Sequence, residues 1–222
     1  MRSLHDFDRE ILRPRLINVL RGPRLPADED ATSKTNSNGP RSTLFELNVA
    51  AILRDAGLQP ELAVHPDVRC RVGDTPLFFE CKRPISEARV AKRITEAGQQ
   101  LQADLAAYAS VDACGIIVLS LAKLFSPSQT PFPINTQRAA QDFLNGWLGA
   151  IVVDTERAWR PLVGAGRLIG ILFHVAAVFV NEAKGRFDLG QWWIGLPLTE
   201  HPGVHPAYAR LGEVLQASAD LS

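Results

Sequence analysis

Residues 66–82 read PDVRCRVGDTPLFFECK, and this stretch predicts the centre of the fold. Two segments within it, Asp67–Val72 and Leu77–Lys82, are short and rich in apolar and β-branched residues, which is typical of strands. Between them, Gly73-Asp74-Thr75-Pro76 is a turn signal, so we expect the two strands to pair as a hairpin. A further short strand is expected at Glu61–His65.

Helices are predicted on both sides of this hairpin. The first is expected to begin near Thr43, which can form a capping box with Glu46, and to stop at Gly57. The second is expected over Ser86–Tyr108, where apolar residues recur at steps of three and four. A continuous apolar run, Gly115–Leu121, then predicts a buried strand. The order helix, strands, helix and strand indicates an α/β fold with a mixed β-sheet flanked by helices.

The remaining elements lie before and after this core. A helix over residues 4–20 is expected to break or kink at Pro14, and residues 22–40 have the composition of a mobile loop. We therefore divide the chain into an N-terminal helix and mobile loop, residues 1–40, and an α/β domain, residues 41–222, with a C-terminal extension. The other expected segments are a loop at 126–133, helices at 137–148 and 206–215, and strands at 168–180 and 191–198.

The composition is that of an ordinary globular protein. Among 222 residues, 24 Lys and Arg balance 24 Asp and Glu, and 46% of the residues are hydrophobic. These values exclude disorder for most of the chain, and they exclude a polybasic binder, so any nucleic-acid surface must be local. The three cysteines lack the spacing of a structural zinc site. No apolar signal core begins the chain and no stretch has the roughly 20 apolar residues of a membrane helix, so we expect a cytoplasmic protein that does not bind membranes.

The second strand of the hairpin ends in a charged pair. Because alternate side chains of a strand share a face, Glu80 and Lys82 are expected to point the same way and Cys81 the opposite way. Asp67 begins the preceding strand, and the hairpin can bring its carboxylate near Glu80. Two carboxylates at one sheet edge suit Mg²⁺ or Mn²⁺, and a lysine beside them can stabilise a phosphate. Asp74 is the alternative second carboxylate, but it lies in a turn where aspartate is common without function, so we prefer Asp67.

This pattern, Pro66-Asp67 followed by Glu80-Cys81-Lys82, resembles the motif of the PD-(D/E)xK nuclease superfamily. The resemblance covers about residues 43–121 and includes the helix before the hairpin, the hairpin, the helix after it and the next strand. It implies a restriction-endonuclease-like core and a Mg²⁺-dependent nuclease, a hydrolase of phosphodiester bonds. We expect DNA as the substrate, with RNA as the open alternative, and a homodimer is plausible for an endonuclease that cuts both strands.

The resemblance also implies roles for individual residues. Asp67 and Glu80 would be metal ligands, helped by the backbone carbonyl of Cys81. Lys82 would be the catalytic lysine. A glutamate on the first helix often joins the site in this family, and Glu46 is the matching position, although Glu46 can equally serve only as the capping partner of its own helix.

The second helix supplies a geometric expectation. With Ile94 at the centre of the apolar face, Gln100 lies about 120° and Arg93 about 100° away on one side. Gln99 and Lys92 lie about 140° and 160° away on the other side and are expected to face solvent. Since the family often places a glutamine or a basic residue of this helix beside the site, Gln100 and Arg93 are candidates to contact it. A solvated helix flank is the equally weighted alternative.

A local basic cluster accompanies the motif and can hold a nucleic-acid backbone. Its members are Lys82, Arg83, Arg89, Lys92 and Arg93, and the N-terminal arginines Arg2, Arg9, Arg13, Arg15, Arg21 and Arg24 can add to it. Such charge runs are usually solvated faces, so the cluster supports the nuclease hypothesis only weakly.

Two other classes of function compete with the nuclease. One is a non-catalytic nucleic-acid-binding or assembly protein with a nuclease-like fold, and the other is a structural α/β domain whose Glu80 and Lys82 form a surface ion pair. Paired carboxylates argue against the first, because they repel a phosphate unless a cation is bound. The apolar residues before Glu80 argue against the second, because they indicate a buried strand.

Histidines and tryptophans outside the motif give weaker signals. We expect His65 at a strand end bordering the site and His174 in the core. Trp192-Trp193 is expected to place one indole in the core and the other where it can stack on a base or a partner. His201 and His205 have a helical ligand spacing, but the proline and glycine between them make a helical metal site improbable.

Overall fold

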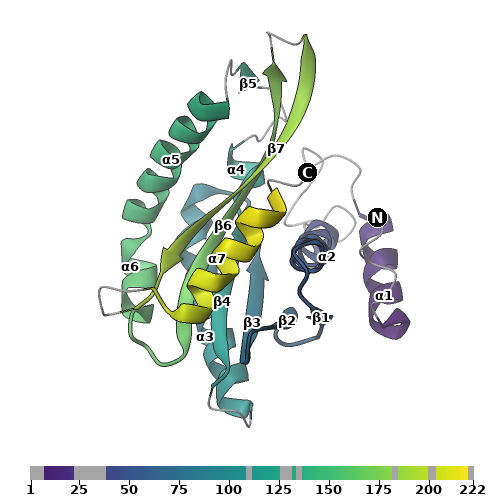
Figure 1. Cartoon of the computed structure of the whole chain (residues 1–222), viewed down its shortest axis with the longest axis vertical. Coiled ribbons are helices and arrows are strands. Elements are labelled where there is room, and N and C mark those ends of the chain that lie inside the picture. Colours follow the sequence, from purple (N-terminus) through teal and green to yellow (C-terminus); the bar gives the residue numbers. More distant parts are fainter. Residues whose placement is uncertain are drawn as a thin grey trace.

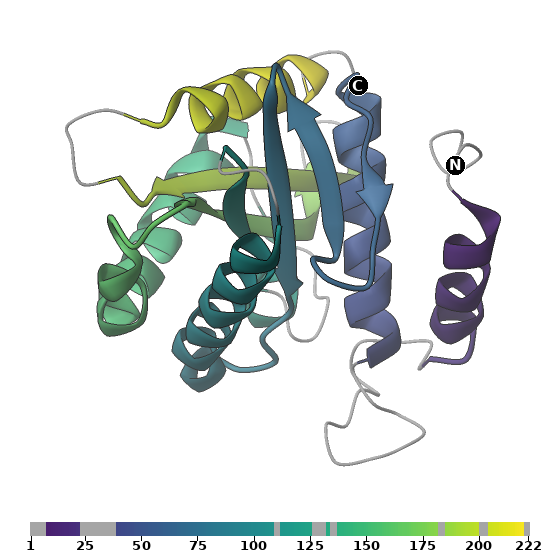
Figure 2. The ribbon, with the colours of Figure 1, turned by 90° about the horizontal axis from the view of Figure 1, so that it is seen from below.

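A computed structural model describes residues 8–22, 39–108, 112–125, 132–133, 137–181, 185–199 and 204–219 (Figure 1). Most of the loop predicted at 22–40, most of the loop predicted at 126–133, and His201 lie outside these residues. Within them, a mixed β-sheet is flanked by helices on both faces, which confirms the α/β fold class (Figures 1 and 2). None of the described helices is both long enough and apolar enough to cross a membrane.

Seven strands of the described chain form the sheet. They are β1 (Glu61–Leu62), β2 (Val68–Val72), β3 (Thr75–Lys82), β4 (Cys114–Ser120), β5 (Phe132–Pro133), β6 (Leu168–Asn181) and β7 (Arg186–Pro197). The order along the sheet begins β1-β2-β3-β4-β6, and β6 also pairs with β5 and β7. The three central strands β3, β4 and β6 are parallel, whereas β1, β2 and β7 pair antiparallel to their neighbours.

The predicted hairpin is formed by β2 and β3. Their register pairs Val68 with Phe79 and Val72 with Thr75. The turn is therefore shorter than expected: Gly73 and Asp74 make it, while Thr75 and the following proline belong to β3. Gly73 has a φ of 61°, which glycine adopts without steric strain.

Helices cover the two faces of the sheet with separate hydrophobic cores. Among the helices described, α3 (Val90–Ala107), preceded by a 3₁₀ turn (Glu87–Arg89), and α5 (Gln137–Asp154) pack on one face. On the other face lie α2 (Gly39–Asp55) and α7 (Pro206–Ala219). The short elements that the sequence did not predict are α4 (Ala122–Phe125), α6 (Glu156–Trp159), the 3₁₀ turn Arg160–Leu162 and β5, which lies within the segment predicted as a loop at 126–133.

The first helix differs from its prediction. In the described residues α1 spans Arg9–Leu20 and continues through Pro14, so the expected break is wrong. Proline removes one backbone hydrogen bond, but the turns before and after it keep theirs. None of the residues of α1 is buried, and the helix packs against α2 on the side away from the sheet (Figure 2).

The start of α2 also differs. The helix begins at Gly39, four residues before the expected cap, so the capping box of Thr43 and Glu46 is wrong. The hydroxyl of Thr43 instead accepts a hydrogen bond of 2.9 Å from Asn18 of α1. The end is as predicted: Gly57 has a φ of 83°, and the next residue closes the helix with a bond to the Leu53 carbonyl. Glu46 is therefore free of any capping role.

The long β6–β7 hairpin places its aromatic residues on both faces. Trp192 packs against the core under α3 and α5, and Trp193 packs against the core under α2 and α7. The two indoles thus lie on opposite faces, as predicted, and both are half-buried. His174 is 4% exposed and lies between Phe45 and Trp193, with ring centroids 5.4 and 4.6 Å away, so its prediction as a core residue is confirmed.

Candidate functional site

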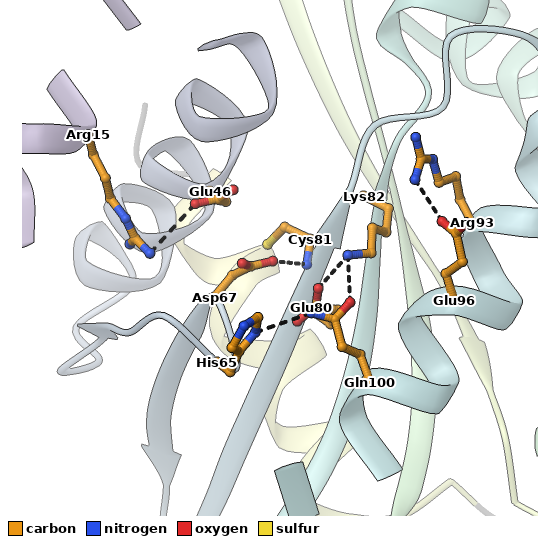
Figure 3. A network of polar contacts seen from close by, with 10 residues as sticks. All are labelled: Arg15, Glu46, His65, Asp67, Glu80, Cys81, Lys82, Arg93, Glu96 and Gln100. Carbon is orange, nitrogen blue, oxygen red and sulfur yellow. Dashed lines mark hydrogen bonds and ion pairs between the residues drawn. The ribbon is translucent and has the colours of Figure 1, made fainter. Parts of the chain in front are cut away.

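A hollow of about 220 Å³ opens where β2 begins and β3 ends, between α2 and α3 (Figure 3). It gathers all four residues of the predicted catalytic set and most of the predicted basic and polar contacts. The lining residues are Ser42, Glu46, Asp67, Glu80, Cys81, Lys82, Arg83, Arg93 and Gln100.

The hairpin register brings the two motif carboxylates together. Since Val68 pairs with Phe79, Asp67 stands opposite Glu80, and the alternation along both strands gives them the same face. The Asp67 carboxylate is fixed by a hydrogen bond of 2.8 Å from the backbone N–H of Cys81 to Oδ2. The expectation that both carboxylates lie on one side of the sheet is confirmed.

Glu80 is the most deeply buried acid of the site. Its side chain is 1% exposed, and Oε1 accepts a hydrogen bond of 2.5 Å from the Lys82 ammonium. The same ammonium donates to Oε1 of Gln100 at 2.9 Å. The second oxygen, Oε2, is buried and has no hydrogen-bond partner among the described residues. A buried carboxylate oxygen without a partner is costly unless a donor or a cation occupies the space beside it.

Glu46 reaches the same hollow from α2 and meets an arginine of α1. The Arg15 guanidinium lies 3.7 Å from Oε2 of Glu46, and it also donates to the backbone carbonyl of Ala63. Its Nη1 is buried without a hydrogen-bond partner among the described residues. Sequence reasoning named Arg15 only as one of six N-terminal arginines, because no spacing within α1 shows which side chain its packing on α2 turns toward the site.

Burial raises the pKa of all three carboxyl groups of the site. Burial, followed by the charge of Asp67, raises the pKa of Glu46 to about 7, while Arg15 opposes both effects. Burial followed by the charge of Asp67 likewise raises the pKa of Glu80 to about 7, against the hydrogen bond from Lys82. Burial raises the pKa of Asp67, and the Cys81 N–H works in the other direction. The charges of Arg15 and Lys82 lower these pKa values, but they offset the effect of burial only in part.

The rotation of α3 agrees with its apolar stripe. Gln100 and Arg93 line the hollow, whereas Lys92 and Gln99 are exposed and lie outside its lining, so the geometric expectation is confirmed. Gln100 contacts Lys82 through its oxygen, and its Nε2 lies 3.2 Å from Nδ1 of His65.

The basic residues of the predicted cluster divide into two groups. Arg83 is buried and lines the hollow, and Arg93 lines it while pairing with Glu96 at 2.6 Å. Arg89 is exposed on the 3₁₀ turn before α3, and Lys92 is exposed on α3 itself; both lie outside the lining of the hollow. The first group is placed to meet a ligand in the hollow, and the second can meet only a ligand that extends beyond it.

The competing residues lie elsewhere. Asp74 is at the hairpin turn, at the other end of β3, where it lines a separate cavity with Cys114 and His205. In that cavity Nδ1 of His205 accepts a hydrogen bond from the backbone N–H of Ala207 at the start of α7. The choice of Asp67 over Asp74 is therefore consistent with the geometry.

The donor set fits a hard divalent cation that keeps part of its water shell. Among the described residues, no group of three or more His, Cys, Asp and Glu side chains has an arrangement that could hold a metal ion. Asp67 and Glu80 nevertheless face one hollow, with an unpartnered buried oxygen between strands. Mg²⁺ is usually bound by one or two carboxylates, with waters and substrate phosphates completing its octahedron, so an open site of this kind suits it.

Comparisons with protein-family models, with curated proteins and with solved structures found no match to this chain.

Proposed function

We propose that this protein is a metal-dependent phosphodiester hydrolase, a nuclease that acts on DNA through a restriction-endonuclease-like core. The observation that carries the proposal is the buried, half-unpartnered carboxylate of Glu80, which faces Asp67 and lies beside Lys82. A buried carboxylate oxygen without a partner destabilises the fold, and carboxylate oxygens are the ligands that divalent cations such as Mg²⁺ prefer.

Asp67 and Glu80, with the backbone carbonyl of Cys81, are the residues that would hold Mg²⁺ or Mn²⁺. When bound, the cation would neutralise charge on the phosphate and lower the pKa of a bound water. The Oε2 of Glu80 supports this assignment, because it is a buried carboxylate oxygen that has no hydrogen-bond partner among the described residues.

Lys82 is held in place for a catalytic role. Two of the three N–H donors of its ammonium are directed at Glu80 and Gln100, which fixes the nitrogen at the mouth of the hollow. The third donor is available to an oxygen of the scissile phosphate, where positive charge stabilises the transition state most strongly. Glu46, whose pKa is about 7, can accept a proton from an attacking water at neutral pH.

Substrate contacts are assigned to the basic residues around the hollow. Arg83 and Arg93 lie within it, Gln100 adjoins the lysine, and Arg89 extends the positive surface along the start of α3. Phosphate contacts of this kind give affinity and a strong salt dependence, with no dependence on sequence.

Cleavage of labelled DNA in the presence of Mg²⁺ or Mn²⁺ tests the proposal. We expect cleavage by the parent protein, its loss in EDTA, and its loss in Lys82→Ala, whereas Lys92→Ala, which changes an exposed lysine of the same region, should retain it. Cleavage that survives in Lys82→Ala would refute the assigned mechanism. The absence of cleavage in all metals, together with the absence of carboxylate-dependent Mn²⁺ binding by calorimetry, would refute the nuclease function.

Arg93→Ala provides a second comparison with Lys92→Ala, in binding rather than cleavage. Because Arg93 lines the hollow and Lys92 does not, we expect the larger loss of DNA affinity from Arg93→Ala. Equal and small losses would instead support a solvated helix flank.

A further inference from the structure

A second cavity, of about 410 Å³, lies over β2 and β3 and is lined by a different set of residues from the hollow. Its floor is β2 and β3, and its walls are the loop after α2 and the end of α3. Four side chains give it its character, namely Arg69, Arg71, Phe78 and Tyr108, and Glu61 is the acid in its lining. We call this cavity the arginine–tyrosine groove.

The strand register connects the groove to the hollow. Arg69 pairs with Phe78, which packs under α3, so Asp67, Arg69 and Arg71 alternate onto the α3 face of β2. Each two-residue step along a strand advances the backbone by about 6.7 Å, so Arg69 and Arg71 follow Asp67 along one face of β2 and continue from the hollow toward the hairpin turn.

The groove presents an aromatic ring and cationic groups together. Tyr108 is 39% exposed and meets Phe78 edge-on, with ring centroids 4.9 Å apart. The Arg69 guanidinium lies over Phe78, 5.3 Å from the ring centroid, and its buried Nε has no hydrogen-bond partner among the described residues. Arg71 is exposed and donates to the backbone carbonyl of Asp74 at 2.6 Å. Two guanidinium groups against the single carboxylate of Glu61 leave the groove positive.

His65 joins the groove to the hollow. Its backbone carbonyl accepts a hydrogen bond of 2.6 Å from Arg69, and its imidazole lies beside Gln100, which holds Lys82 (Figure 3). A chain of direct contacts therefore runs from the groove to the ammonium that we assign to the scissile phosphate.

We propose that the arginine–tyrosine groove binds unpaired nucleotides of the strand next to the bond that is cut, so that the substrate is single-stranded DNA or a duplex with a single-stranded tail. This inference rests on the proposed nuclease function. Tyr108 stacks on the face of a base, and Arg71 and Arg69 contact the phosphates on either side of it. In a paired duplex the faces of a base are already covered by its neighbours, whereas an unpaired base offers its face to an aromatic side chain.

Binding without metal tests the groove separately from catalysis. The probes are a labelled 12-nucleotide single strand and a blunt duplex of the same sequence, both measured in EDTA. We expect the parent protein to bind the single strand more tightly than the duplex. Tyr108→Leu should weaken single-strand binding about tenfold without changing its salt dependence, and Tyr108→Phe, which keeps the ring, should bind like the parent.

Arginine variants test whether the groove contacts phosphates. Arg71→Gln should weaken single-strand binding and reduce the slope of log K against log salt by about 0.7. Arg157→Gln, which changes an exposed arginine of α6 outside the groove lining, is the matched control and should change neither quantity. The groove is refuted if Tyr108→Leu and Arg71→Gln bind the single strand within twofold of the control, or if the parent prefers the blunt duplex.

Cleavage assays then separate this inference from the proposed function. Loss of single-strand binding in the groove variants of a parent that cuts no DNA would refute the nuclease and leave the groove as a binding site. A parent that cuts tailed DNA, with groove variants that bind and cut it equally well, would refute the groove and leave the nuclease.

Discussion

Glu80→Gln should make the metal-free protein more stable while removing its response to metal. Burial and the charge of Asp67 raise the pKa of Glu80 from 4.5 to about 7, so its ionisation opposes folding. At about 1.4 kcal/mol per pH unit, that change corresponds to about 3 kcal/mol above pH 7. Part of this penalty is shared with Asp67, and an amide oxygen still accepts the Lys82 hydrogen bond, so we expect a net gain of about 1–2 kcal/mol.

Thermal unfolding in EDTA measures this gain. For a chain of this length, 1–2 kcal/mol raises the Tm by about 2–8 °C. The sign depends on pH: a raised folded-state pKa penalises folding fully above about pH 7, and the penalty disappears below about pH 4.5, where the parent glutamate is protonated in both states. The difference between variant and parent should therefore be large at pH 8 and small at pH 4.5. Glu87→Gln, which changes an exposed glutamate, is the control.

Adding Mn²⁺ should make the parent protein more stable than Glu80→Gln. A ligand at 100 times its Kd stabilises the folded parent by about 2.7 kcal/mol, whereas Glu80→Gln has lost a charged ligand and should gain little. A variant that is less stable than the parent in EDTA at pH 8 would show that Glu80 has a structural role. A variant whose Tm rises with Mn²⁺ as much as that of the parent would show that Glu80 is not a metal ligand.

Three further predictions follow from the contacts around the site and in the core. Arg15→Gln should raise the pKa of Glu46 and that of the proposed ligand Asp67, so the pH midpoint of Mn²⁺ binding by calorimetry moves upward, while exposed Arg13→Gln leaves it unchanged. Burial lowers the pKa of His174 to about 4, so the neutral buried imidazole favours folding fully above about pH 6.5, and this stability is lost as the pH falls toward 4. His174→Phe removes this loss, so between pH 7 and pH 4 its free energy of unfolding, measured with denaturant, should rise by up to about 3 kcal/mol relative to that of the parent. Gln100→Leu should release Lys82, for which we propose a catalytic role, and lower kcat about tenfold with little change in KM, whereas a similar loss in exposed Gln99→Leu would indicate a general effect on α3.

The parts of the site that could be predicted depend on local periodicity. Strand alternation placed Glu80 and Lys82 together, and a tight turn with Gly73 aligned Asp67 opposite them. The apolar stripe of α3 likewise set which of its polar residues face the hollow, because that stripe can pack in only one rotation on the sheet. These relations involve residues close in the sequence, so few conformations compete with them.

The parts that could not be predicted depend on contacts between distant segments. Arg15 reaches Glu46 only because α1 packs on α2, and the spacing of residues within α1 does not determine that packing. The start of α2 at Gly39 also involves α1: Thr43, which was expected to cap α2, lies inside the helix and accepts a hydrogen bond from Asn18 of α1. The arginine–tyrosine groove also needs two distant elements, because Tyr108 stands beside β2 only after α3 has crossed the sheet.

The hollow and the groove differ in charge, and under the proposed function this difference assigns them separate tasks. In the hollow, the carboxylates of Glu46, Asp67 and Glu80 face three basic residues of the lining, Lys82, Arg83 and Arg93, so the hollow has no excess of positive charge, and its paired carboxylates disfavour a phosphate unless a cation is bound. In the groove two guanidinium groups face one carboxylate, so phosphates are attracted without metal. Under the proposed function the strand would therefore bind in the groove first, and the scissile phosphate would enter the hollow once Asp67 and Glu80 hold the cation. Because coupling between two ligands is reciprocal, a bound strand must then raise the affinity for the cation by the same factor as the cation raises the affinity for the strand.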